Sequence, residues 1–330
     1  MSEKLLEVKD LAIHFFTDGE EACAVNGITF DLDAQEVIGF VGETGAGKTT
    51  TALGIMGLIP NPPGKILSGE ILFEGKDLLK LSEPEMRQIR GNKITMIFQD
   101  PMTSLNPVLT VGEQISEVIL LHNKISKKEA IYRTKEMLEL VGIPGDRYDE
   151  YPHQFSGGMK QRVVIAIALA CNPALLIADE PTTALDVTIQ AQVLELMRKL
   201  KDELRTSMIM ITHDLGVVAE ICDKVAIVYA GEIVESGTLK EIYEDRKHPY
   251  TEGLFSSIPD LEEEVEYLPV IEGLMPMPTN LPSGCKFHPR CPYATELCAQ
   301  SNPTTVAITD THMVRCHLFH ASEAEKGQVE

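Results

Sequence analysis

The sequence predicts an α/β fold whose core is a mostly parallel sheet. Short apolar runs rich in β-branched residues recur along the chain, at positions 36–41, 94–98, 175–178, 208–211 and 225–229. Runs of this kind are typical of strands that are buried on both faces of a parallel sheet. A glycine-rich stretch follows the first run and precedes a helical pattern at 50–58, so a strand, a tight loop and a helix follow one another there.

The N-terminal region has a different pattern, which predicts an antiparallel β subdomain. Residues 5–16 alternate apolar and polar side chains, residues 18–21 predict a turn, and residues 24–32 predict the returning strand. Another strand is expected at 69–73, after a loop that contains three prolines. Ser82 followed by Pro84 then indicates the start of a helix.

Two later segments depart from the β/α alternation. From 110 to 141 apolar residues recur at helical spacing, which predicts a helical insertion within a subdomain of about 100–165. After about residue 253 the chain has many prolines, an acidic run at 262–264 and four cysteines. We therefore expect a main domain at 1–253 and a small loop-rich C-terminal extension at 254–330.

Composition limits the classes of partner. The net charge of −21 argues against a nucleic-acid partner and against electrostatic docking on an anionic membrane, since both need clustered Lys and Arg. The longest nearly uncharged run, 163–178, is interrupted by Asn172-Pro173 and is too short to span a bilayer. The N-terminus leads into acidic, strand-like sequence and lacks the pattern of a secretion signal. A cytoplasmic chain is expected, with any membrane role carried by partner subunits.

The glycine-rich stretch satisfies every position of the P-loop pattern, which places the chain among the P-loop NTPases. Its glycines allow successive backbone N–H groups to face a phosphate, and the following helix N-terminus adds partial positive charge. Lys48 is expected to reach the β- and γ-phosphates of ATP, and the Thr49 hydroxyl to bind Mg²⁺. The predicted nucleotide-binding residues of this loop are Gly42, Glu43, Thr44, Gly45, Ala46, Gly47, Lys48, Thr49 and Thr50.

Two further motifs complete an ATPase pattern. The apolar strand at 175–178 ends in Asp179, which is placed to hold Mg²⁺, and Glu180, which suits activation of the attacking water. Ser156, Gly157 and Gly158 open a long apolar helix and predict a second anion site at its N-terminus.

Together these motifs resemble the ATPases of ABC transporters, in which the Ser-Gly-Gly signature of one subunit completes the P-loop site of its partner. The resemblance implies that Gln99 is the Q-loop glutamine, which contacts Mg²⁺ or water, and that His213 is the switch histidine, which contacts the γ-phosphate. It also implies that Phe15, or its neighbour Phe16, stacks on adenine, and that residues 184–186 form the D-loop. Met159, where many members have Gln, departs from the pattern without removing the phosphate-binding residues.

The cysteine-rich segment predicts a metal site. In a reducing cytosol such thiols favour a metal over disulfides. The four cysteines are separated by 5, 6 and 17 residues, without the closely spaced pairs of compact zinc sites. An iron–sulfur cluster, of the 4Fe–4S kind, is therefore favoured, with zinc or plain thiols as alternatives, and one of three nearby histidines, 288, 312 and 317, is a possible substitute ligand. The predicted ligands are Cys285, Cys291, Cys298 and Cys316.

The same segment, with His248-Pro249-Tyr250-Thr251, is similar to the ATPase subunits of oligopeptide and dipeptide importers, and nickel importers are close relatives of these. The resemblance implies an ATP-hydrolysing subunit that works as a face-to-face dimer with a second homologous ATPase subunit. It further implies two membrane permease subunits, an extracytoplasmic peptide-binding protein and a place at the cytoplasmic face of the membrane. One alternative is a soluble ABC ATPase with an iron–sulfur centre that acts on ribosomes or nucleic acid. A nucleotide-binding regulator without turnover conflicts with the presence of Glu180 and His213.

Overall fold

The structure is a computed structural model that describes residues 4–99, 104–183, 186–257 and 270–320. The chain forms two compact units, each built from several stretches of sequence. The first unit comprises Met1–Leu6, Leu32–Val37 and Phe73–Thr212, and the second comprises Glu7–Asp31, Ile38–Leu72 and His213–Glu330. Two predicted features, Ala184 and Leu185 of the D-loop and the acidic run at 262–264, lie outside the described residues.

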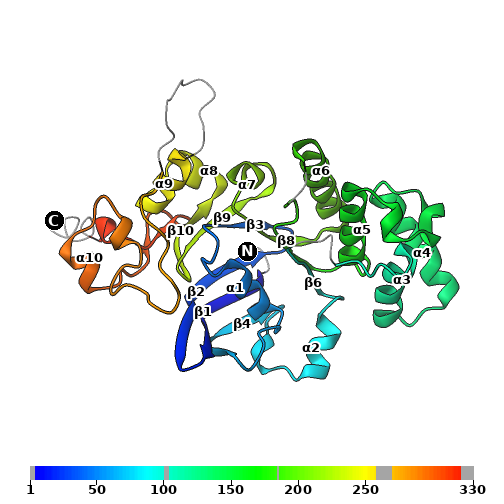
Figure 1. The fold of residues 1–330 in the computed structure, drawn as a ribbon, viewed down its shortest axis with the longest axis horizontal. Helices are drawn as coiled ribbons and strands as arrows, with labels where there is room; N and C mark the ends of the chain where they lie inside the picture. Colours follow the sequence, from blue (N-terminus) through cyan, green and yellow to red (C-terminus); the bar gives the residue numbers. More distant parts are fainter. Residues whose placement is uncertain (1–3, 100–103, 184–185, 258–269, 321–330) are drawn as a thin grey trace. The chain divides into compact units, whose positions relative to one another are not determined.

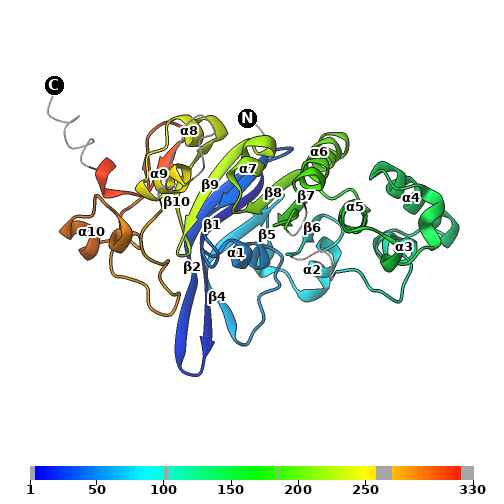
Figure 2. The ribbon, with the colours of Figure 1, turned by 45° about the horizontal axis from the view of Figure 1, so that its top comes forward.

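The N-terminal strands confirm the predicted antiparallel subdomain. β1 (Lys4–Thr17) and β2 (Glu20–Asp33) form the long dark-blue hairpin in Figure 2, and β4 (Gly64–Phe73) lies on the other side of β1. Leu11 and Ile13 of β1 are fully buried, as the apolar–polar alternation predicts. The turn places Asp18 at a φ of 50° and Gly19 at 85°, which suits a tight hairpin connection.

A second sheet of the second unit combines central and C-terminal strands. β3 (Val37–Val41) pairs in parallel with β9 (Lys224–Tyr229), and β9 pairs antiparallel with β10 (Glu232–Thr238). β12 (Met313–Val314) pairs with β10, and β11 (Val306–Ala307) pairs with β12. The C-terminal segment therefore continues this sheet. The helices of the unit are α1 (Lys48–Ile55), α7 (Leu215–Ile221), α8 (Leu239–Glu244), α9 (Pro249–Ser256) and α10 (Glu296–Gln300), with 3-10 turns at His288–Arg290 and His317–Phe319.

The first unit contains three of the predicted parallel strands. β6 (Ile94–Ile97), β7 (Leu175–Asp179) and β8 (Ser207–Thr212) pair side by side in parallel, with Ile97 opposite Ala178 and Asp179 opposite Ile211. α5 (Gly157–Leu169) lies between α6 (Val187–Leu204) and the pair of helices α3 and α4 (Figure 1). The remaining elements are β5 (Lys76–Asp77), α2 (Glu83–Ile89) and 3-10 turns at Leu78–Lys80, Gly145–Asp149 and Pro152–Gln154.

The stretch predicted to be helical forms α3 (Val111–His122) and α4 (Lys127–Leu140). Thr110 and Ser126 cap their N-termini, since each side-chain oxygen accepts a hydrogen bond from a backbone N–H in the first turn. Between the two helices, the Ser116 and Thr134 hydroxyls are 2.8 Å apart in a buried hydrogen bond. The predicted limits of the subdomain, about 100–165, and the domain boundary at 253 stay predictions.

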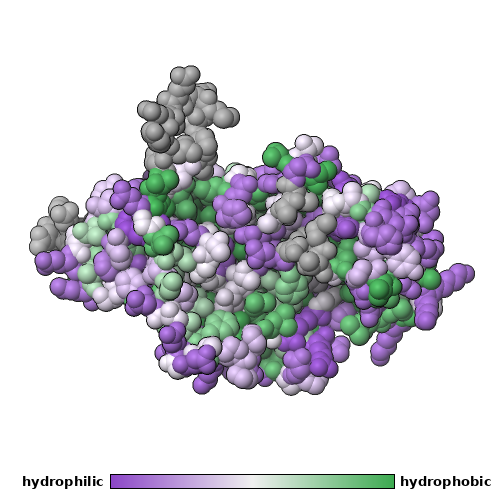
Figure 3. Space-filling model, viewed as in Figure 1, coloured by the Kyte–Doolittle hydropathy of each residue, from purple (hydrophilic) through white to green (hydrophobic). Residues whose placement is uncertain are grey.

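The surface is mixed, with polar residues over much of the face in Figure 3 and apolar residues scattered among them. Among the described residues, no helix combines the length and the apolar composition needed to cross a bilayer.

Candidate functional site

The predicted phosphate loop lies in the second unit, between the fully buried strand β3 and helix α1. A Cβ atom on Gly42 would lie 2.1 Å from the Val228 carbonyl oxygen, and one on Gly47 would lie 2.4 Å from the Ala24 carbonyl oxygen. Gly47 also has a φ of 101°, which side-chain-bearing residues rarely adopt. These two glycines are therefore required by close backbone packing as well as by the predicted phosphate contacts.

Lys48 and Thr49 occupy the first turn of α1, whose N-cap, Gly47, has no side chain to occupy the helix N-terminus. Lys48 is 6% exposed, and its ammonium group donates to the carbonyl oxygens of Gly42 and Glu43 at 2.6 and 3.0 Å. Thr49 is exposed. The loop thus combines a cation, an exposed hydroxyl and helix N–H groups, a set of donors that suits a phosphate.

Phe15, the predicted adenine-stacking residue, lies in β1 and is half-buried. Its ring is close to the start of β4, because a Cβ atom on Gly64 would lie 2.8 Å from Phe15 Cε1. Phe16, the alternative, is 46% exposed. The role of either ring in binding adenine stays a prediction.

The predicted acidic pair lies in the first unit, at the end of β7. Asp179 is 1% exposed, and Glu180 has a φ of +46°, a left-handed conformation that is unusual for a residue with a side chain. The Glu180 carboxylate accepts hydrogen bonds from Gln99 Nε2 at 3.2 Å and from the Thr183 hydroxyl at 2.9 Å. The structure therefore brings together Gln99 and Glu180, which are 81 residues apart in the chain.

The serine–glycine turn also lies in the first unit, where Ser156 is the N-cap of α5 and accepts a hydrogen bond from the Met159 N–H. Gly158 allows α5 to approach α6 closely, since a Cβ atom there would lie 2.7 Å from Ile189 Cγ2. Gln161, one turn further along the helix, donates a hydrogen bond to the carbonyl oxygen of Pro181 at 2.6 Å. Pro181 directly follows Glu180. The helix that begins at the signature is thus bonded to the segment that carries the acidic pair.

His213 belongs to the second unit, follows directly on β8 in the sequence and is exposed. The next residue, Asp214, caps α7 by accepting hydrogen bonds from the backbone N–H groups of Gly216 and Val217. The phosphate loop and His213 therefore lie in one unit, and the residues Gln99, Asp179, Glu180 and Ser156–Gly158 lie in the other.

The four predicted cysteine ligands line one small cavity in the second unit. Three are half-buried and the fourth, Cys316, is buried. Phe287, His248, His288 and His317 also line this cavity. The third histidine considered from sequence, His312, is instead fully buried, with Nε2 2.7 Å from Glu235 Oε1. Four cysteines spread over positions 285–316 thus converge on one space.

Hydrogen-bond partners surround these thiols. The backbone N–H groups of Phe287, Tyr293 and Leu318 bond to the sulfurs of the cysteines two residues before them, and the Thr295 hydroxyl is 3.4 Å from Cys298 Sγ. Burial is the largest effect on the pKa values of Cys285, Cys291 and Cys316 and raises each of them. Burial, with a smaller contribution from the neighbouring thiols, brings the pKa of Cys316 to about 11. A bound metal would supply the positive charge that four thiolates need.

Four thiolates can hold either a single zinc ion or an iron–sulfur cluster. Four sulfurs around zinc lie about 3.8 Å apart, given Zn–S bonds of about 2.3 Å. An iron–sulfur cubane, in which each thiolate binds a different iron, holds its sulfurs farther apart. Among the described residues, a group of three potential ligands within 4.8 Å of one another lies in the N-terminal hairpin.

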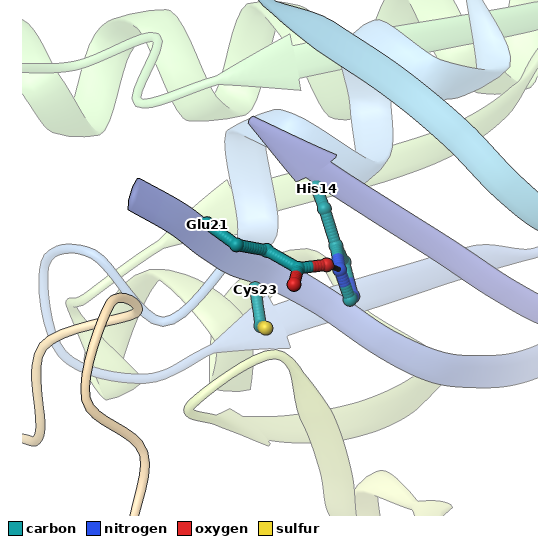
Figure 4. Close-up of side chains that lie close together, drawn as sticks. All are labelled: His14, Glu21 and Cys23. Carbon is teal, nitrogen blue, oxygen red and sulfur yellow. Dashed lines mark hydrogen bonds and ion pairs between the residues drawn. The ribbon is translucent and has the colours of Figure 1, made fainter. Parts of the chain in front are cut away.

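That hairpin group consists of His14, Glu21 and Cys23 (Figure 4). His14 Nδ1 and Glu21 Oε1 are 2.6 Å apart, so a hydrogen bond accounts for their closeness. Cys23, which a strand-like sequence would place in the core, is partly exposed beside them. The sequence holds no metal motif here, and only the pairing of the two strands brings the three side chains together.

Comparison with known proteins agrees with this geometry. The family model described as ABC transporter matches residues 25–183, and the model described as the oligopeptide/dipeptide transporter C-terminal region matches residues 234–298. The oligopeptide transport ATP-binding protein OppD of Bacillus subtilis is 57% identical over 320 residues, which cover 96% of this chain and 89% of that protein. The dipeptide transport ATP-binding protein DppD of the same organism is 52% identical, with coverage of 96% and 95%.

Solved structures of ABC ATPases share the fold. The ATP-binding cassette MJ0796, in a dimeric post-hydrolysis state bound to ADP and phosphate, is 28% identical with a TM-score of 0.64, and the match covers 71% of this chain and 98% of that one. CbiO1 of Clostridium perfringens, part of an ABC transporter complex, is 29% identical with the same TM-score and coverage of 74% and 92%. The chain is thus an ATPase of the ABC transporter class, and it belongs to the family of oligopeptide and dipeptide transport ATP-binding proteins.

Proposed function

We propose that this chain is the energy-coupling subunit of an importer of dipeptides or oligopeptides, located at the cytoplasmic face of the membrane. The named relatives are peptide-transport proteins, which favours this function over action on ribosomes or nucleic acid. The observation that carries the proposal is the Glu180 carboxylate, held by Gln99 and Thr183 at the end of a buried strand. A fixed carboxylate at this position suits activation of water for ATP hydrolysis.

ATP is the substrate, and the residues from Gly42 to Thr50 would cradle its phosphates. Lys48 exchanges its bonds to the loop carbonyls for bonds to the β- and γ-phosphates, and Phe15 stacks on adenine. The oxygen donors Thr49, Asp179 and Gln99 fit Mg²⁺, which prefers such ligands and neutralises phosphate charge when bound. Glu180 takes the proton of the attacking water on its carboxylate, and His213 donates a hydrogen bond to the γ-phosphate.

A second ATPase subunit would complete the site. Ser156, Gly157 and Gly158 present a hydroxyl and the N-terminus of a 13-residue helix, which suits the triphosphate bound by an opposing subunit. The partner is a homologous subunit or a second copy of this chain, and closure of the two on ATP drives transport.

Two permease subunits would receive this motion. Phe98, next to Gln99, is 45% exposed, and Val108 and Leu121 of the helical region are each 75% exposed. Exposed apolar residues on the same unit as the acidic pair suit contact with membrane subunits. The peptide-binding protein outside the membrane acts through those permeases, and the transported peptide touches them and not this chain.

The proposed role of Glu180 is tested with the Glu180→Gln variant of the purified complex. Loss of the general base should lower the rate of ATP hydrolysis by about 10²–10⁴-fold while ATP still binds and remains trapped. Glu203→Gln is the matched control, because Glu203 is an exposed carboxylate at the end of α6, 3.7 Å from Lys199. Undiminished turnover in Glu180→Gln would exclude Glu180 as the base.

We further propose that Cys285, Cys291, Cys298 and Cys316 hold an iron–sulfur cluster with a structural role. The thiols line one cavity, each with a hydrogen-bond partner at its sulfur, and their spacing in the sequence lacks the close pairs of compact zinc sites. Such a cluster would cross-link loops that contain few regular elements. Anaerobic purification should give a brown protein containing iron and acid-labile sulfide, and Cys316→Ser should lose both. Stoichiometric zinc without iron would refute the cluster.

A further inference from the structure

The guanidinium of Arg290 lies beside the phosphate loop, where it is nearly buried and bonded to several oxygen atoms. Arg290 is 6% exposed in its side chain, and Nη1 lies 2.8 Å from Glu43 Oε1. Its other nitrogen atoms donate to the carbonyl oxygens of Glu272 and Ile271 at 3.0 and 3.3 Å, and Nη1 also approaches the Tyr229 hydroxyl at 3.4 Å. Glu43 is thus the carboxylate that compensates a nearly buried guanidinium.

Glu43 is the second residue of the phosphate loop and is held at three points. Its carboxylate binds Arg290, its backbone N–H donates to the Tyr250 hydroxyl at 3.0 Å, and its carbonyl oxygen accepts from Lys48 at 3.0 Å. The first two partners come from the part of the chain after residue 248. The conformation of the loop therefore depends on C-terminal residues that are more than 200 positions away.

An aromatic cluster fixes these partners in place. The rings of Tyr229, Tyr250 and Phe287 lie 4.6–5.4 Å apart from centroid to centroid, and the Arg290 guanidinium lies 5.8 Å from the centre of the Tyr229 ring. Phe287 also lines the cysteine cavity, and Arg290 directly precedes Cys291. The position of the guanidinium therefore depends both on its packing against the Tyr229 ring and on the backbone of the cysteine-bearing segment.

The charge of Glu43 makes this arrangement matter for nucleotide binding. A triphosphate is a polyanion, and a carboxylate in the loop that binds it repels it unless the carboxylate is compensated or turned away. Arg290 does both, since it neutralises Glu43 and holds its side chain against the C-terminal segment. Such a charge-assisted bond in a partly buried site is stronger than one in water.

We propose that Arg290 is a positioning residue for the ATP site, which acts by holding and neutralising Glu43. This inference rests on the proposed ATPase function. If Arg290 acts in this way, the C-terminal segment contributes to the affinity for nucleotide. Arg290 directly precedes Cys291, one of the predicted cysteine ligands.

The test is the Kd for ATP of the purified full chain, measured with a fluorescent ATP analogue and by competition with ATP. Arg290→Ala should raise the Kd about tenfold, the effect of losing one charge-assisted hydrogen bond, and Arg290→Lys, which keeps the charge but loses the fork, should raise it less. Arg315→Ala is the matched control, because Arg315 also precedes a cysteine, Cys316, but contacts Pro303 and Glu232, and the Kd of this variant should stay within about twofold of the wild-type value.

A double-variant cycle separates positioning of Glu43 from general damage to the C-terminal segment. In a chain that already carries Glu43→Gln, Arg290→Ala should change the Kd by no more than about twofold, because the carboxylate that needed compensation is gone. An unchanged Kd in Arg290→Ala, or an equal loss in both backgrounds, would overturn the proposal. A wild-type chain that binds no ATP would overturn the proposed function, and this inference with it.

Discussion

Replacement of Glu235 by glutamine should destabilise the second unit strongly, although the two side chains have almost the same shape. Glu235 lies in β10 and is 1% exposed. Its carboxylate accepts three hydrogen bonds, from the backbone N–H groups of Lys247 and His248 at 2.6 and 2.9 Å and from His312 Nε2 at 2.7 Å. It thus joins β10, the N-terminus of α9 and the C-terminal segment.

The size of the effect follows from the number of donors. A carboxamide offers one oxygen acceptor, and its NH₂ group is itself a donor, so the Glu235→Gln substitution would leave one or two of the three buried donors without an acceptor. Each buried donor that loses its partner costs about 1–3 kcal/mol. We expect a loss of about 2–4 kcal/mol, which at about 2 °C per kcal/mol for a chain of this size lowers the Tm by about 4–8 °C.

Thermal unfolding followed by far-UV circular dichroism measures this difference at neutral pH. Glu244→Gln is the control, because Glu244 is an exposed carboxylate on α8, 3.8 Å from Lys240, and its loss should change stability by less than about 0.5 kcal/mol. A Tm for Glu235→Gln that matches the Tm of this control would show that water or a rearranged side chain satisfies the three donors, and the expected loss of acceptors would be wrong.

Two further predictions concern the phosphate loop and the acid stability of the chain. Gly42→Ala should weaken ATP binding at least tenfold in the assay with the fluorescent analogue. The added Cβ atom would lie 2.1 Å from the backbone oxygen of Val228 and displace the loop. An unchanged Kd would show that β9 moves to accommodate the methyl group. Burial acts to raise the pKa of Glu241, but hydrogen bonds from Thr309, Thr238 and Thr311 outweigh it and lower that pKa to about 2. The ionised carboxylate therefore adds stability above its ordinary pKa near 4.5, and this stability is lost as the pH falls toward 2. The difference in urea midpoint between wild type and Glu241→Gln should shrink from pH 5 to pH 3, and a constant difference would contradict the assignment.

Local patterns predicted the parts of the fold that depend on neighbours in sequence. The apolar runs became β3, β6, β7, β8 and β9, and the helical spacing at 110–141 became α3 and α4. The phosphate loop could be recognised from the sequence because its glycines, Lys48 and Thr49 lie within one short stretch. In each case the residues that determine the structure lie within about twenty positions of one another, so a single sequence contains the signal.

The strands β10, β11 and β12 escaped prediction for a physical reason. Glu232 and Glu235 of β10 are both buried. Because buried strand positions are expected to be apolar, a sequence with two carboxylates at these positions is not predicted to form a buried strand. Glu235 is compensated by His312, 77 positions away, and Glu232 accepts a hydrogen bond from Asn302 and lies 3.5 Å from Arg315. Such partners become visible only when the chain has folded.

Similar long-range contacts connect the cysteine-bearing segment to the rest of the second unit. Its composition differs sharply from that of the preceding chain, yet its contacts reach back across residue 253 at several points. β12 extends the sheet at β10, the Cys23 N–H donates to the Pro278 carbonyl oxygen at 2.9 Å, and Arg290 binds Glu43 in the phosphate loop. These contacts all lie within one compact unit, together with the loop itself. A change that loosens the cysteine cavity therefore acts on a framework that also holds Glu43. With Arg290 in the positioning role proposed above, such a change should also lower the affinity for ATP.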